Sequence, residues 1–397
     1  MTTKAAIQTK TAIDVGRAQA SYAIETRRAL HSIPELGWEE TKTIAYIEKQ
    51  IDQLLPLIPF DATKTIYEGG ICVDIDVHES LNRILFRADI DGLPIEEKTG
   101  LDFASEHEGV MHACGHDCHS AMLLGALRGL ATGVEPTSNL RLVWQRAEEI
   151  FTAQSGGARL VAEGITDGIL CAHGLHISST MPSGEFFSRP GIMMANAAHI
   201  NMEISCTGGH VMSPDKGSNA IDIATDIHIA LRNFCIRVLG PNKPTAFIPS
   251  VSTAGVKPSI MPDKVNISYS MRNFLDPSNL HEFFQKLKRH IESIVSAYED
   301  ASLDAFCLLP GFPPLSNDTV LYGHTSDVLE MAGLKTNKCH LLFCGEDFSY
   351  YTQQKPGSFW MLGAKQGPGF DHHTSYFNPD ENALWKGVAY WIALATA

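Results

Sequence analysis

The stretch His112-Ala113-Cys114-Gly115-His116-Asp117-Cys118-His119 places six side chains that can hold a metal ion or a proton within eight residues. A thiolate, imidazoles and a carboxylate together form the ligand set that borderline metals such as zinc prefer. Cys114 and His116 lie two residues apart, so a tight turn lets both reach one ion or two adjacent ions. Capping a helix would explain one or two of these residues but not six. The stretch therefore predicts a metal site.

The residues that follow predict where this site lies. From Ala121 onward the chain reads Ala-Met-Leu-Leu-Gly-Ala-Leu, an apolar run with helical character that extends to about Leu130. We therefore expect the ligands to lie at a loop-to-helix junction, where side chains converge without being buried in the helix.

Composition excludes several classes of protein. The chain has 397 residues, 44% of them hydrophobic, which allows two or three domains with substantial cores. Its formal charge of −14 argues against a nucleic-acid partner or an anionic membrane surface. Nine cysteines beside 17 histidines fit a reducing compartment and a metal site better than a disulfide scaffold. No run of eighteen apolar residues and no signal-peptide pattern is seen, so we expect no membrane contact and a cytoplasmic location.

Outside its middle, the chain alternates between helical and strand patterns. This is the α/β arrangement, in which sites gather at the carboxyl ends of the strands. The pattern continues after Pro313, where it ends in an amphipathic helix from Glu381. The predicted helices are Ile13–Leu30, Glu39–Leu55, Gly157–Glu163 and Thr319–Met331, and the predicted strands are Gly70–Val77, Arg83–Asp89, Leu140–Arg146, Gly168–Leu175 and Phe359–Leu362.

The pattern changes between about Ala195 and Gly311. The order there is β-α-β-β-α-β, which is typical of a ferredoxin-like domain. We therefore expect this domain, residues 195–311, to be inserted into a larger domain made of residues 1–194 and 312–397. Its predicted elements are the strands Ala198–Thr207, Ala246–Thr253, Lys264–Asn273 and Ser302–Leu308 and the helices Asn219–Cys235 and Asn279–Ala297.

Further candidate site residues follow predicted strands. Glu148 and Glu149 end one strand, where adjacent side chains point apart, so one carboxylate can hold metal while the other handles a proton. His176 follows another strand, and Asp371-His372-His373-Thr374 precedes the last helix. Asp91 lies at a third strand end, where it can orient a ligating histidine. A solvated acidic pair and packed histidines are the alternative interpretation of each feature taken alone.

Seven short motifs occur along the chain in an order that resembles a known family. They are similar to the amidohydrolase branch of the dinuclear-metal aminoacylase and carboxypeptidase family, which includes hippurate hydrolases, N-acyl-amino-acid amidohydrolases and indole-acetyl-amino-acid hydrolases. The resemblance covers nearly the whole chain. The motifs are Arg28-Ala-Leu-His-Ser-Ile-Pro-Glu-Leu, Asp89-Ile-Asp-Gly-Leu-Pro-Ile-Glu-Glu, Met111-His-Ala-Cys-Gly-His-Asp, Gln145-Arg-Ala-Glu-Glu, Gly174-Leu-His, Gly208-Gly-His and Gly345-Glu-Asp-Phe-Ser.

The resemblance implies a metallopeptidase-like catalytic domain with a mixed sheet, and a ferredoxin-like lid that usually forms a dimer interface. It implies that Glu148 is the general base, that His210 stabilises the oxyanion from the partner subunit, and that Arg272 meets the substrate carboxylate. The implied cofactors are two divalent metal ions, zinc or manganese, with cobalt or nickel as alternatives. The implied ligands are Cys114, which bridges the two ions, and His116, Glu149, His176 and His373.

The chain departs from the family pattern around the substrate. Arg146 stands where the family usually has Pro, Ile150 stands where it has Gly, and several extra residues precede Gly156. In the lid, Asp215 replaces a common His, and Ser259, a candidate substrate contact, replaces a common Asn. His372-His373-Thr374-Ser375 replaces the usual Leu-His-Ser-Pro, so His372 is an alternative to His373 as the last ligand.

These expectations define an enzyme. The resemblance implies a metal-dependent amidohydrolase that cleaves N-acyl amino acids, a small-molecule substrate, into a carboxylic acid and an amino acid. A dipeptidase or carboxypeptidase with the same centre is the first alternative, and a requirement for a free substrate amine would identify a dipeptidase. A non-catalytic, metal-dependent binding protein is the second alternative.

Overall fold

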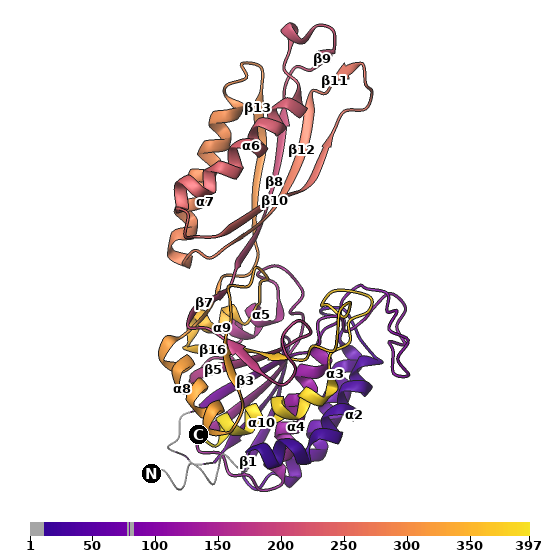
Figure 1. Cartoon of the computed structure of the whole chain (residues 1–397), viewed down its shortest axis with the longest axis vertical. Helices are drawn as coiled ribbons and strands as arrows, with labels where there is room; N and C mark the ends of the chain where they lie inside the picture. The colour runs from indigo at the N-terminus through magenta and orange to yellow at the C-terminus, as the bar shows by residue number, and fades with distance from the viewer. Residues whose placement is uncertain (1–11, 78, 80–82) are drawn as a thin grey trace. The chain divides into compact units, whose positions relative to one another are not determined.

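The computed structural model describes residues 12–77, 79 and 83–397. The chain divides into two compact units (Figure 1). The large unit contains Met1–Met193, Ser316–His340 and Asp347–Ala397, and the inserted unit contains Met194–Leu315 and Leu341–Glu346.

The large unit is organised by an eight-stranded mixed sheet. Its strand order is β1-β2-β4-β3-β5-β16-β6-β15. Strands β4, β3, β5 and β16 are parallel neighbours, so their carboxyl ends meet at one edge of the sheet. This edge carries the candidate site. The strands are β1 (Asp61–Tyr67), β2 (Gly70–Asp76), β3 (Arg83–Asp89), β4 (Asn139–Gln145), β5 (Ile169–Ser178), β6 (Phe186–Ser188), β15 (Thr336–Lys338) and β16 (Gly357–Gly363).

Helix α4 is the best-buried helix near the site. It spans His116–Ala131, packs against α2 (Ala20–His31), α3 (Thr41–Leu54) and α10 (Leu384–Ala395), and contacts strand β3. Helix α10 is buried along nearly its whole length. The expectation of an amphipathic last helix was therefore wrong, because neighbouring helices cover α10 on the side that we expected to face water.

Shorter elements complete the large unit. Helix α5 (Gly156–Ala162) packs on α9 (Ser349–Gln354), and α8 (Thr319–Met331) packs on β16 and α10. The first predicted helix is interrupted at Gln19, where a turn separates the helical residues 12–18 from α2. Strand β1 was not predicted, because its side chains are mostly polar and it forms an exposed edge of the sheet. The short strands β7 (Gly191–Met194) and β14 (Leu315–Asn317) pair with each other.

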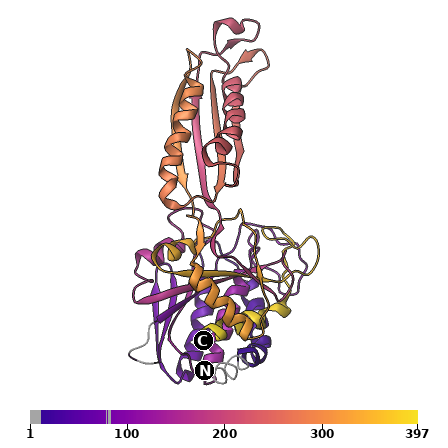
Figure 2. The same cartoon turned by 60° about the vertical axis from the view of Figure 1, so that its left-hand side comes forward.

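The inserted unit has the ferredoxin-like arrangement that the sequence predicts. Its sheet order is β10-β12-β8-β13 with every neighbouring pair antiparallel, and two helices pack on it (Figure 2). Side chains of β12 alternate between exposed and buried because one face of the sheet meets the helices. The elements are β8 (Asn196–Ser205), α6 (Ala220–Leu239), β10 (Thr245–Ala254), β12 (Lys264–Asn273), α7 (Pro277–Val295), β13 (Ser302–Pro310) and the small pair β9 (Gly209–His210) and β11 (Ile260–Met261).

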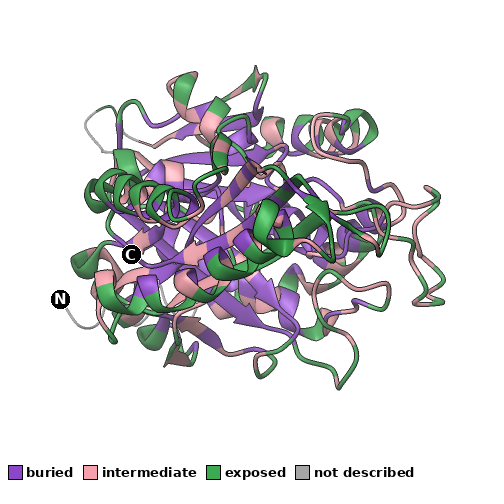
Figure 3. Ribbon diagram, turned by 90° about the horizontal axis from the view of Figure 1, so that it is seen from above, coloured by how far each residue is buried: buried purple, intermediate pink, exposed green. Residues whose placement is uncertain are grey.

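Each unit has its own hydrophobic core. Buried residues line the sheets, whereas exposed residues lie on outer helices and loops (Figure 3). Among the described residues, no helix is long and apolar enough to cross a membrane. The predicted fold class, a mixed α/β catalytic domain with a ferredoxin-like insertion, is confirmed.

Candidate metal centre

Cys114 and His116 lie on either side of a turn that only glycine fits. Gly115 has φ +95°, and a Cβ there would lie 2.4 Å from Ile177 Cγ2. The turn leads directly into α4, which begins at His116 rather than near Ala121 as expected. The histidine and the residues after it therefore occupy the first, buried turn of the helix. The apolar pattern alone did not reveal this start, because polar residues fill that turn.

Glu148 and Glu149 lie three and four residues beyond the end of β4, not at its last position as expected. Ala147 before them has φ +51°, a left-handed conformation that a non-glycine residue rarely adopts. The Ala147 N–H donates to Glu40 Oε1 (2.7 Å), and the Glu149 N–H donates to Asp91 Oδ2 (2.9 Å). Contacts on both sides therefore hold this turn, which we call the glutamate turn (residues 147–149).

His116 offers one ring nitrogen to the centre. Its Nδ1 lies 3.0 Å from Asp91 Oδ1, so Nδ1 carries the proton and donates to that carboxylate. Its Nε2 is buried and has no hydrogen-bond partner. Burial lowers the pKa of His116, but Asp89, Asp91 and Glu149 outweigh burial and raise it to about 10. The surrounding carboxylates thus create a negative potential that favours a bound cation at this nitrogen.

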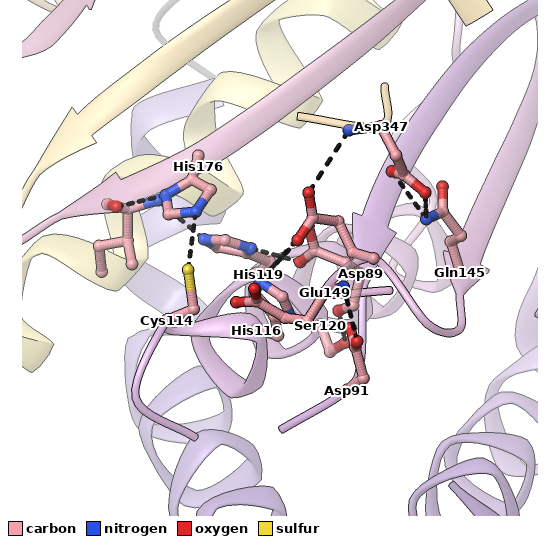
Figure 4. A network of polar contacts seen from close by, with 12 residues as sticks. Asp89, Asp91, Cys114, His116, His119, Ser120, Gln145, Glu149, His176 and Asp347 are labelled. Atoms are coloured by element: carbon pink, nitrogen blue, oxygen red, sulfur yellow. Dashed lines mark hydrogen bonds and ion pairs between the residues drawn. The ribbon is translucent and has the colours of Figure 1, made fainter. Parts of the chain in front are cut away.

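His176 is oriented in the same way from another element. It lies within β5 rather than beyond it, because the strand continues to Ser178. Its Nδ1 donates to Ile177 O (2.5 Å), so Nε2 is left as the acceptor, 3.4 Å from Cys114 Sγ (Figure 4). Burial lowers the pKa of His176, so the ring is neutral, as a metal ligand must be.

The geometry separates the two adjacent histidines of the last motif. His373 Nε2 lies 3.3 Å from Cys114 Sγ and 3.4 Å from Glu149 Oε1. His372 Nε2 instead accepts the Ser179 N–H (3.1 Å), so this nitrogen is already occupied. His373, whose backbone is left-handed with φ +58°, is therefore the better ligand of the two.

Two groups of three potential ligands share one sulfur atom. Cys114 forms one group with His116 and His176 and another with Glu149 and His373, and the ligand atoms within each group lie within 4.8 Å of one another. His116 Nε2 and Glu149 Oε1 are buried without hydrogen-bond partners, as expected of atoms whose partner is an ion. The donor set, a thiolate with imidazoles and a carboxylate, fits divalent metal ions, and Cys114 could serve either group.

His119 and Asp89 also lie close to His116, but their atoms are already used. His119 Nε2 accepts the Ile177 N–H (2.8 Å), so its Nδ1 carries the proton and donates to Asp89 Oδ1 (2.5 Å). Asp89 Oδ2 accepts from Arg87 (2.6 Å). The hydrogen bonds of His119 and Asp89 are therefore satisfied without a bound ion.

Sequence reasoning missed a buried network beside the glutamate turn. Arg87, Gln145 and Asp347 are joined by hydrogen bonds. Figure 4 shows the contact between Gln145 and Asp347. The Asp347 N–H also donates to Glu148 Oε1 (3.4 Å). Asp347 lies in the Gly345-Glu-Asp-Phe-Ser motif, which was the only signal available for it. Arg87 gave no signal beyond being a charged residue inside a strand.

Three further predicted residues lie in the inserted unit. His210 is exposed on β9, where it pairs with Ile260 of β11. Arg272 is half-buried on β12 and donates to Ser270 Oγ (3.0 Å), and the Ser259 carbonyl accepts the Val211 N–H. The five predicted metal ligands, Glu148 and Asp91 all lie in the large unit.

Comparison with known proteins gives a consistent result. Residues 85–397 match the model of peptidase family M20/M25/M40. N-acetyl-L-cysteine deacetylase of Bacillus subtilis strain 168 is 35% identical over 371 residues, which are 93% of this chain and 86% of that protein. N-acetyldiaminopimelate deacetylase of Halalkalibacterium halodurans is 32% identical over 383 residues, which are 93% of this chain and 97% of that protein. A solved Bacillus subtilis structure, described as a dinuclear metal binding peptidase from the M20 family, has a TM-score of 0.81 at 27% identity and covers 96% of this chain and 98% of its own.

Proposed function

The chain belongs to peptidase family M20/M25/M40 and is a hydrolase of amide bonds, and we propose that its substrates are N-acyl amino acids. Family membership confirms the resemblance that the motifs indicated. The observation that carries the proposal is the pair of ligand groups sharing Cys114, with the Glu148 carboxylate beside them. The names of the two deacetylase relatives support an acylated amino acid as the substrate class.

The metal ions would be held by Cys114, His116, Glu149, His176 and His373, with zinc or manganese suited to this mixture of sulfur, nitrogen and oxygen donors. When bound, they would supply an acidified water molecule and a Lewis acid for the substrate carbonyl. Asp91 fixes the His116 tautomer and, through the Glu149 N–H, the position of a second ligand.

Glu148 takes the role of general base. Its Oε2 lies 4.0 Å from His116 Nε2, so it faces the ligand atoms, while its Oε1 accepts the Asp347 N–H. It accepts a proton from the attacking water and returns it to the leaving amine. In the inserted unit, we assign Arg272 to the substrate carboxylate, Ser259 to a further substrate contact and His210 to the oxyanion.

The roles of the two adjacent glutamates can be separated. Glu148→Gln should keep both metal ions but lose at least ~100-fold in kcat, the usual scale for a positioned base. Glu149→Gln should lose metal. Both variants are measured by metal analysis and by hydrolysis of N-acyl amino acids with added zinc or manganese. If Glu148→Gln lost its metal and Glu149→Gln kept it, the two roles would have to be exchanged.

The same hydrolysis screen tests the alternatives. The solved relative is described as a peptidase, which favours dipeptides or carboxypeptidase substrates as the second candidate class. Faster cleavage of peptides with a free amine than of their N-acyl counterparts would replace the proposed class with a dipeptidase. A protein that binds two metal ions but cleaves none of these substrates would contradict the proposed substrate class.

We also propose that the chain forms a homodimer through the inserted unit, in the cytoplasm. Strand β10 lies at an edge of its sheet and exposes Ile248 (57%) and Val251 (51%), and helix α6 exposes Ile229 (56%) and Ile236 (61%). An unpaired edge with apolar neighbours can pair with its twin across a twofold axis. All nine cysteines are free, which suits a reducing compartment.

Subunit exchange tests both the dimer and the role of His210. His210→Ala chains are mixed with Glu148→Gln chains, each inactive alone. Hybrid dimers should regain up to about half of wild-type activity, because one of their two sites combines an intact base with an intact histidine. No recovery after demonstrated exchange would mean that His210 acts within its own chain or not at all.

A further inference from the structure

Glu148, the proposed base, contacts a peptide group whose position is fixed by an unusual set of hydrogen bonds. Its Oε1 accepts the backbone N–H of Asp347 (3.4 Å), and its Oε2 faces His116 Nε2. The two oxygens therefore differ: one is held by the protein, and the other points toward the ligand atoms.

Hydrogen-bond donors already surround the Asp347 carboxylate. Its Oδ1 accepts from Arg87 Nη2 (2.5 Å) and Gln145 Nε2 (2.9 Å), and its Oδ2 accepts from Gln145 Nε2 (2.8 Å) and the Gly157 N–H (2.7 Å). The side chain is fully buried. These bonds fix the residue, and with it the direction of its own backbone N–H.

Arg87 connects this carboxylate to the other side of the centre. Its planar guanidinium donates to Gln145 Oε1 (2.9 Å), to Asp89 Oδ2 (2.6 Å) and to Asp347. Asp89 in turn accepts from His119, which accepts the N–H of Ile177, the neighbour of His176. One buried chain of hydrogen bonds thus runs from a ligand-bearing strand to the base.

We propose that Asp347, held in place by Arg87, is a positioning residue for Glu148. Its peptide N–H holds Oε1, so Oε2 is presented to the reacting water. The proposal rests on the proposed function of Glu148 as the base. It differs from a purely structural role, in which the network stabilises the fold and affects catalysis no more than any other buried ion pair.

A double-mutant cycle distinguishes the two roles. Asp347→Asn should keep its metal and a KM within about two-fold of wild type while losing ~10–100-fold in kcat, since a misplacement of about 1 Å can cost this much. If Asp347 acts only through Glu148, the double variant Asp347→Asn/Glu148→Gln should be no slower than Glu148→Gln alone. Structural damage would instead slow the double variant by the full additional factor.

The chain offers a matched control. Asp74 also accepts two hydrogen bonds from a sheet arginine, Arg141 (both 2.8 Å), but it lies at the opposite end of the strands. Asp74→Asn likewise removes a carboxylate charge that is bonded to a sheet arginine. It should leave kcat within about two-fold of wild type, because Asp74 touches no residue of the network. An equal loss of kcat in Asp74→Asn and Asp347→Asn would overturn the proposal.

A second variant covers the case in which Asp347→Asn does not fold. Arg87→Lys keeps the charge but loses the forked geometry. It should lose less kcat than Arg87→Met, keep its metal, and show no further loss when combined with Glu148→Gln. Loss of metal in Arg87→Lys, or additive losses in the cycle, would overturn the proposal. Full activity of Glu148→Gln would instead remove the proposed base itself, so the two failures are distinguishable.

Discussion

The two ends of strands β3 and β4 use the same chemistry in different surroundings. At their starting ends, Arg83 and Arg141 both bond to Asp74, and these three side chains keep 10–20% of their surface exposed. At their carboxyl ends, Arg87 bonds to Asp89 and Asp347, and all three are at most 2% exposed. One end is thus partly hydrated, and the other is dry.

The difference shows what burial adds to an ion pair. A partly hydrated pair can rearrange with water, so its geometry is loosely defined and its energy modest. A dry pair must be fully matched, because an unpaired charge there costs several kcal/mol. The dry end therefore holds its groups in a defined geometry, which a catalytic centre requires, whereas the hydrated end contributes only to stability.

The largest expected difference between the two ends of the strands is in metal binding, and a cysteine near each end can be used to measure it. Cys114→Ala should lower metal affinity by at least ~100-fold and abolish hydrolysis, because it removes the atom shared by both ligand groups. Cys72, a buried neighbour of Asp74, provides the control: Cys72→Ala should keep both metal ions and its activity. Metal analysis after gel filtration measures both variants. If Cys114→Ala kept its metal ions as Cys72→Ala does, the two ends of the strands would not differ in metal binding.

The second prediction concerns stability. Arg87→Met leaves two buried carboxylates without their cation and should lower the free energy of unfolding by about 3–5 kcal/mol. Arg141→Met should lower the free energy of unfolding by only about 1–2 kcal/mol, because Asp74 keeps both Arg83 and water as partners.

Urea unfolding followed by tryptophan fluorescence measures both arginine variants. The signal reports on the large unit alone, since all five tryptophans, Trp38, Trp144, Trp360, Trp385 and Trp391, lie there. Equal losses of stability in the two variants would contradict the distinction between a hydrated and a dry end.

The third prediction uses pH to examine another carboxylate near the dry end. Burial and the charge of Asp91 raise the pKa of Glu40 from 4.5 to about 7. Between these values the folded state binds more protons than the unfolded state, so the contribution of Glu40 to stability falls as pH rises through this window and is constant above it. Glu40→Gln removes this dependence.

The free energy of unfolding of Glu40→Gln, measured relative to that of wild type, should therefore increase by about 1–3 kcal/mol as the pH is raised from 4.5 to 8. Urea unfolding of both proteins at pH 5 and pH 8, with metal bound, gives the two differences. A difference that is the same at both pH values would mean that Glu40 is ionised throughout, with Arg146 and the Ala147 N–H sufficient to hold its charge.

Much of the fold could be predicted from periodicity. Strand β12 and helix α8 begin and end at the predicted residues. Apolar residues recur every second residue in a strand and every three to four residues in a helix, and this spacing is clear where one face is buried and the other is not. The start of α4 was missed because its first turn is buried yet polar. Its polar residues include His116, a proposed metal ligand, and they do not show the apolar pattern of an ordinary buried helix.

The site was predictable where a motif is short and local. Cys114, Gly115 and His116 are neighbours, and the geometry of the turn follows from them. The contact between Arg87 and Asp347 joins residues 260 positions apart, and neither residue carries a local pattern that names its partner. Such a contact becomes visible only when the sheet has brought its carboxyl ends together.

The pairing of β16 with β5 and β6 has a consequence for how the protein is made. Strand β16 is inserted between strands that precede the whole inserted unit in sequence, so the central sheet cannot close until the chain beyond that unit has been synthesised. Asp347 and His373 arrive with this last segment. A nascent chain therefore carries Cys114, His116 and Glu149 before it carries Asp347, the residue that we propose positions Glu148.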